Sequence, residues 1–197
     1  MEHTSVQKLA RVLRVMVILV FVCNIAALFA VPGMVALSPR SVIDAGIQEA
    51  SYLLGLEQMA EHEIYFPLAI LLAVSWAEVW KEAYSAVLTV FLWACGICTA
   101  VILWQAKRVL DTILAGATFT FGNAANMKRA AVCCFVISGA ALLRTVWGLF
   151  YYQSVGPLLT YNALFVPAFL VAGLGCMVMS ALFRQAAEMK AENDLTI

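Results

Sequence analysis

The chain has 197 residues, of which 64% are apolar and only 12% are charged, and its mean hydropathy is +0.92. Soluble globular chains carry about 25% charged residues, and a chain this short has too little interior to hide so much apolar surface from water. Twelve basic and twelve acidic residues give no net charge, which argues against direct nucleic-acid binding. The composition also excludes a disordered chain, and it predicts an integral membrane protein.

The first apolar run covers residues 15–39 and follows Arg11 and Arg14. A hydrocarbon core about 30 Å thick requires roughly 20 apolar residues, so we predict a membrane-spanning helix at about 15–36. A cleaved secretory signal is the alternative, but its apolar core is only ~7–15 residues long and ends at a small-residue cleavage site. No such site stands out near Pro32, and the pattern therefore favours a retained helix.

The connecting segment, about 38–84, is predicted to be helical and extracytoplasmic. Ser38 and Pro39 suit the cap and first position of a helix, and apolar residues at helical spacing favour an amphipathic helix on the outer membrane surface. Residues 64–77 are too short to span, so we expect either an interfacial or re-entrant helix or an outer extension of the next span. The segment carries seven acidic residues against two basic ones, namely Asp44, Glu49, Glu57, Glu61, Glu63, Glu78 and Glu82 against Arg40 and Lys81.

Three further spans are predicted at about 85–106, 130–151 and 161–183. The polar, turn-forming run 153–157 divides the last two. The runs are continuous and do not alternate, which argues against a β-barrel. The prediction is an all-α polytopic membrane protein with four transmembrane helices in a single membrane domain, 1–197.

Basic residues predict the orientation, because loops rich in Lys and Arg stay in the cytoplasm. Nine of the twelve lie in the N-terminal piece, the loop between the second and third spans, and the tail: Lys8, Arg11, Arg14, Lys107, Arg108, Lys128, Arg129, Arg184 and Lys190. Only Arg40 and Lys81 lie in the connections predicted on the other side. Both termini are therefore expected in the cytoplasm.

Arg144 is the one charged residue inside the predicted spans, in the outer half of the third. Charges at such depth usually face protein, water or a partner, and Glu78 or Glu82 are the nearest acidic candidates. Arg144 has either a structural or a functional role. In the structural role its side chain reaches the outer headgroups or forms an ion pair, and in the functional role it contacts a ligand or belongs to a switch pair. The aromatic residues predicted near the outer interface either anchor the chain in the membrane or line a ligand pocket.

Two other patterns contain residue types that can carry out redox chemistry or bind a metal. Cys95 and Cys98 form a CxxC near the middle of the second span, where a thiolate is poorly solvated and no basic residue adjoins it. Packing is the favoured interpretation of these thiols. The triplet Glu61-His62-Glu63 is poor evidence for a metal site, and no metal or cofactor is predicted.

Two segments from Trp104 onward carry a family pattern: the loop Ile113–Thr120 with Asn123, and the tail from Leu182 to Ile197. Both resemble the bacterial membrane proteins described as domain of unknown function 2975, which have four predicted spans, a Gly-x-Pro-Phe loop before the third, and an end close to Glu-Asn-Asp-Leu-Thr-Ile. Thr118 departs from that pattern, because the family usually has proline before the residue that matches Phe119.

The resemblance implies a bacterial inner-membrane protein without an established enzymatic activity, and a partner among small cytoplasmic helix-turn-helix transcription regulators. The candidate partner-binding residues are Gly116, Phe119, Asn123, Glu192, Asn193, Asp194, Leu195, Thr196 and Ile197. The leading hypothesis is a non-enzymatic sensor or regulatory partner. The alternatives are a carrier for a lipid or small hydrophobic ligand, with a cavity near Arg144, and a membrane thiol oxidoreductase. The sequence predicts no oligomeric state.

Overall fold

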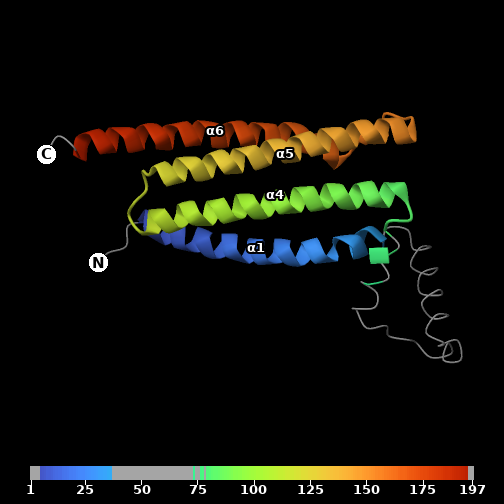
Figure 1. Ribbon diagram of the computed structural model, residues 1–197, viewed down its shortest axis with the longest axis horizontal. Coiled ribbons are helices and arrows are strands. Elements are labelled where there is room, and N and C mark those ends of the chain that lie inside the picture. The colour runs from blue at the N-terminus through green and yellow to red at the C-terminus, as the bar shows by residue number, and fades with distance from the viewer. Residues whose placement is uncertain (1–4, 37–72, 74–75, 78, 195–197) are drawn as a thin grey trace, which may run out of the picture. The chain divides into compact units, whose positions relative to one another are not determined.

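The computed structural model describes residues 5–36, 73, 76–77 and 79–194, and every regular element in those ranges is helical. The elements are α1 (Ser5–Ala36), α4 (Ala83–Leu114), α5 (Phe121–Tyr152), the short 3-10 helix η2 (Gly156–Leu159) and α6 (Tyr161–Asp194), as Figure 1 shows. The four long helices are all apolar and long enough to cross a membrane. The prediction of an all-α protein with four spans is confirmed.

The helices are longer than the predicted spans, and nearly all of the difference lies at one end. We call this the loop end: the start of α1, the end of α4, residues 115–120, the start of α5 and the end of α6. Here α1 begins ten residues before the predicted span, α4 ends eight after it, α5 begins nine before it and α6 ends eleven after it. At the opposite ends the bounds agree within two residues.

These extensions correspond to about 12–17 Å of helix at 1.5 Å per residue. They are rich in Ala, Lys, Arg, Gln and Glu, residues that support a helix in water as well as in lipid. A hydropathy pattern locates the apolar run only, so it ends the predicted span before the helix itself ends. The result is a helical surface that continues beyond the membrane-spanning part.

The chain divides into two compact units. The first unit comprises residues 1–25 and 94–197, and its centre is the antiparallel pair α5 and α6, seen side by side in Figure 1. Ser138 Oγ donates to the Val166 carbonyl at 2.8 Å, and Ser180 Oγ donates to the Ala124 carbonyl at 2.7 Å. Both bonds join α5 to α6 and fix the register between the helices.

The second unit comprises residues 26–93. Its described core is a buried cluster of Val31, Val35 and Val79, against which Trp93 packs. The Trp93 Nε1–H donates to the Leu28 carbonyl at 3.2 Å. Trp76 and Trp80 lie against the same indole, with ring centroids 5.4 and 6.2 Å away. Trp93 therefore joins the end of α1 to residues that precede α4.

Two predictions about the connecting segment lie outside the described residues. They are the amphipathic helix that starts at Ser38 and most of the region 64–77. The single membrane domain 1–197 also stays a prediction.

Candidate functional site

The loop between α4 and α5 begins with a specific helix-ending geometry. Gly116 has a φ of +77°, in the left-handed region where glycine is favoured. Its N–H donates to the Ile113 carbonyl at 3.1 Å, and the Ala117 N–H donates to the Thr112 carbonyl at 2.9 Å. This pair of bonds is the Schellman motif, which satisfies the last carbonyls of a helix. Gly116, singled out from the sequence as a partner contact, therefore has a defined role in ending α4.

Asn123, another predicted partner contact, lies inside this loop and is fully buried. Its side-chain Nδ2 donates to the Thr118 carbonyl at 2.8 Å and to Thr112 Oγ1 at 2.7 Å. The single hydroxyl proton of Thr112 goes to the Val109 carbonyl at 2.7 Å, which leaves the oxygen free to accept from Asn123. The Thr120 side chain caps α5 by accepting from the Asn123 N–H at 3.3 Å. Asn123 thus holds the end of α4, the loop and the start of α5 together.

The loop is attached to α6 through Phe119. Its ring lies 6.3 Å from that of Phe183, centroid to centroid. Phe119 nevertheless remains 51% exposed, and its neighbour Phe121 is 55% exposed. Both precede the predicted third span, so they lie in the part of the chain that extends beyond the apolar run. Large exposed aromatic side chains outside lipid indicate a contact surface.

The end of α6 continues this surface. Arg184 Nε lies 2.9 Å from Glu188 Oε1, an i, i+4 ion pair of the kind that supports a solvent-exposed helix. Glu192 and Asn193 are exposed, and Asp194 is the last residue of α6. Leu195, Thr196 and Ile197 lie outside the described residues. We call residues 115–121 together with 183–194 the loop surface.

Arg144, the charged residue within α5, has a partner that the sequence did not suggest. Its Nη1 donates to Asn162 Oδ1 at 2.8 Å, and Asn162 is buried at the start of α6. A neutral amide thereby satisfies part of a charged group inside a span, where an unsatisfied polar group is costly. Of the predicted acidic partners, Glu78 lies outside the described residues. Glu82 belongs to the other compact unit, where its Oε2 accepts from Ser85 Oγ at 3.2 Å.

The cysteines and the triplet Glu61-His62-Glu63 are the remaining patterns from the sequence. All six cysteines are free: Cys23, Cys95, Cys98, Cys133, Cys134 and Cys176. Cys98 on α4 lies close to Cys133 on α5, a proximity between helices that fits the packing interpretation. Glu61-His62-Glu63 lies outside the described residues, and among those that the structure describes no group of three His, Cys, Asp or Glu side chains is suited to hold a metal.

Sequence reasoning missed three residues that organise these sites: Asn162, Thr112 and Asp111. Asp111 joins two cations, because Arg14 Nε lies 2.8 Å from its Oδ1 and Lys107 Nζ lies 3.1 Å from its Oδ2. Asp111 is the one acidic residue in the sequence between Lys107 and Arg129. Its position among four basic residues could have indicated an ion pair. Asn162 lies near the start of the predicted fourth span, which runs antiparallel to the third span that carries Arg144. Its polar side chain could therefore have been considered as a partner of Arg144.

The four apolar helices and the polar loop end define a multi-pass membrane protein. The family model described as "Protein of unknown function (DUF2975)" matches residues 58–197, which is more than half of the chain. The chain therefore belongs to this family, and the resemblance noted from Trp104 onward is confirmed and extends further toward the N-terminus. Comparison with curated proteins and with solved structures gives no match.

Proposed function

We propose that this protein is a non-enzymatic membrane component that binds a cytoplasmic regulator through its loop surface. The observation that carries the proposal is Phe119, which is half exposed although the Asn123 network and the Phe183 ring fix the loop around it. An ordered backbone that presents an exposed aromatic side chain loses little conformational entropy on binding. Aromatic residues are also enriched where partner proteins bind.

The charge distribution supports the orientation that this proposal needs. The start of α1, the end of α4, the start of α5 and the end of α6 all belong to the first unit and lie at its loop end (Figure 1). Nine of the twelve basic residues of the chain lie at or next to this end. By the positive-inside rule the loop surface then faces the cytoplasm, as do both termini. A helix-turn-helix regulator is the partner class that the family resemblance implies.

The outer half supplies the sensing part of the proposal. Arg144 and Asn162 form a polar pair between α5 and α6, the same two helices that carry the loop surface at their other ends. A signal that separates this pair changes the packing of α5 against α6. Such coupling requires two states with different contacts at both ends.

A quantitative pulldown with the detergent-solubilised full chain tests the proposed interaction. We compare wild type, a chain lacking residues 192–197, and Phe119→Ala. Phe150→Ala is the matched control, because Phe150 is 79% exposed and lies near the opposite end of α5. Loss of one central aromatic contact typically weakens an interface by at least about 2 kcal/mol, which is more than tenfold.

We expect a helix-turn-helix protein to be retained by wild type and by Phe150→Ala. Its recovery should fall more than tenfold with Phe119→Ala, and also with the shortened chain. A partner list unchanged by both variants would refute the loop surface as the binding site. An unchanged list with the shortened chain alone would remove the tail from it.

A further inference from the structure

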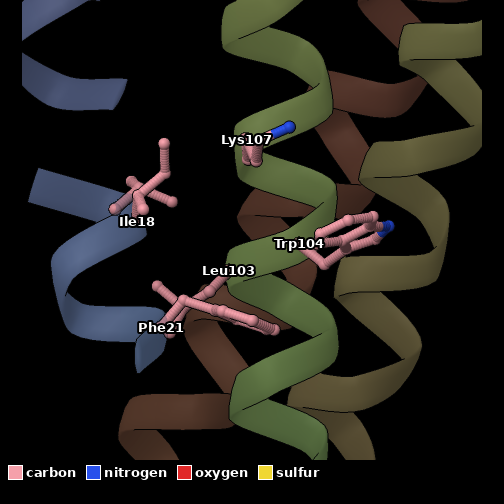
Figure 2. A pocket seen from close by; sticks show the side chains of 6 residues that line it. Ile18, Phe21, Leu103, Trp104 and Lys107 are labelled. Carbon is pink, nitrogen blue, oxygen red and sulfur yellow. The ribbon is translucent and has the colours of Figure 1, made fainter. Parts of the chain in front are cut away.

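An apolar groove lies between α1 and α4 near the loop end, outside the loop surface. Its volume is about 230 Å³, and its lining is Val17, Ile18, Phe21, Leu103, Trp104 and Lys107. In Figure 2, Ile18 and Phe21 project from α1 toward Leu103 of α4, and Lys107 lies one helical turn from Trp104. Five of the six lining residues are apolar, so the groove is suited to a hydrocarbon chain.

Cations gather at one end of this groove. Lys107 Nζ lies 5.2 Å from the centre of the Trp104 ring, and the Arg108 guanidinium lies 6.0 Å from it. Arg14 and Lys107 share the single carboxylate of Asp111. Three cations and one carboxylate leave this cluster with a net charge of +2, so it is electrostatically suited to an anion.

The apolar groove and the cation cluster lie at the depths in the membrane that suit the acyl chain and the headgroup of a phospholipid. The five apolar groove residues belong to the apolar runs that form the spans, whereas Lys107 and Arg108 directly follow the predicted end of the second span at residue 106. Trp104 stands between the two parts, and tryptophan prefers the level of the lipid headgroups. Basic pockets between transmembrane helices on the cytoplasmic side are suited to anionic headgroups.

We infer that the groove between α1 and α4 binds an anionic phospholipid of the bilayer. One acyl chain lies against Ile18, Phe21 and Leu103, and the phosphate lies beside Lys107 and Arg108. The bound lipid adds contacts between α1 and α4, beside the Arg14–Asp111 ion pair and the Phe21–Trp104 ring contact that join the two helices within this unit. Neither Phe119 nor the tail takes part, so the site is independent of the proposed function.

Native mass spectrometry of the full chain in a neutral detergent tests this inference. Phosphatidylglycerol and phosphatidylcholine with identical acyl chains are titrated separately, and glycerol phosphate is added as a headgroup without chains. Each cation near an anionic headgroup contributes about fivefold to affinity. We expect phosphatidylglycerol to bind at least fivefold more tightly than phosphatidylcholine, and we expect millimolar glycerol phosphate not to compete.

The variants separate the headgroup contact from general surface charge. Arg108→Gln changes an exposed residue and should weaken phosphatidylglycerol binding about fivefold. Lys107→Gln with Arg108→Gln should bring the two lipids within twofold of each other. The matched control is Lys128→Gln with Arg129→Gln, an equal loss of charge at two exposed residues of α5 at the loop end, which should keep the preference.

The apolar part is tested by Ile18→Trp, which fills the groove and should weaken both lipids. Far-UV circular dichroism checks that each variant keeps its helices. The charge-preserving exchange Lys107→Arg with Arg108→Lys should retain binding and so keeps the test valid if the glutamine pair unfolds. Four results would overturn the inference. They are equal binding of the two lipids by wild type, an equal loss of binding in the Lys128→Gln, Arg129→Gln control, competition by glycerol phosphate alone, and a second copy of the chain bound in place of lipid.

Discussion

Replacement of Asn123 by Leu is expected to lower the free energy of unfolding by about 3 kcal/mol, because it removes the side chain that joins α4, the loop and α5. Leu has a similar size but cannot donate, so the Thr118 carbonyl and Thr112 Oγ1 lose the hydrogen bonds that the fully buried Asn123 amide donates to them. Buried polar groups without partners each cost about 1–3 kcal/mol. Titration of the chain in detergent micelles with a denaturing detergent, followed by tryptophan fluorescence, measures this change.

The control is Asn193→Leu, the same chemical change at an exposed position near the end of α6. Substitutions at such positions usually change stability by less than about 0.5 kcal/mol. Hydrogen exchange provides a second readout, since Asn123→Leu should speed the exchange of amides in residues 115–124. If Asn123→Leu were as stable as the control and equally protected, the loop would not depend on this network.

Gly173→Ala is expected to destabilise the contact between α5 and α6 by about 2 kcal/mol, because it overfills the interface. A Cβ at this position would lie 2.7 Å from Cε1 and 3.0 Å from Cδ1 of Phe135, closer than side chains tolerate. Small residues at such positions allow membrane helices to approach closely. The Phe135 distances place Gly173 inside the contact between α5 and α6.

The chain supplies a matched control for this prediction in Gly175. A Cβ there meets nothing within 4 Å, so Gly175→Ala should leave the stability unchanged or raise it slightly through helix propensity. The double variant Gly173→Ala with Phe135→Leu should recover part of the loss, because the smaller side chain gives the new methyl group space. Equal unfolding midpoints for Gly173→Ala and Gly175→Ala, measured by the same detergent titration, would contradict the close approach.

The number and place of the spans were predictable, because hydrocarbon thickness sets the length of an apolar run and the turn at 153–157 is visible in the sequence. The ends of the helices at the loop end were not. The end of α4 depends on the Schellman motif at Gly116 and the start of α5 on the cap at Thr120, and both lie among charged or small residues that hydropathy does not separate from a loop. Helix-ending residues predict such bounds better than hydropathy does.

The side-chain partners were less predictable than the residues themselves. Arg144 was identified from its charge alone, but its bond to Asn162 depends on the register between α5 and α6, which a single sequence does not encode in any local pattern. Asn123 was identified only through a family resemblance, which suggested a partner contact. Its burial shows a structural role, and the exposed Phe119 that it supports remains the candidate for direct contact.

The most direct test of the account is the accessibility of three single cysteines to a membrane-impermeant maleimide in intact cells and in inverted vesicles. Ala115→Cys and Asn193→Cys lie at the loop end, and Ser154→Cys lies between α5 and α6 at the other; all three positions are exposed. The wild-type chain is the control, because its own cysteines lie within the helices. We predict that Ser154→Cys reacts in intact cells and that the other two react only in inverted vesicles. Reaction of Ala115→Cys or Asn193→Cys in intact cells, with Ser154→Cys protected there, would contradict a loop surface that faces the cytoplasm.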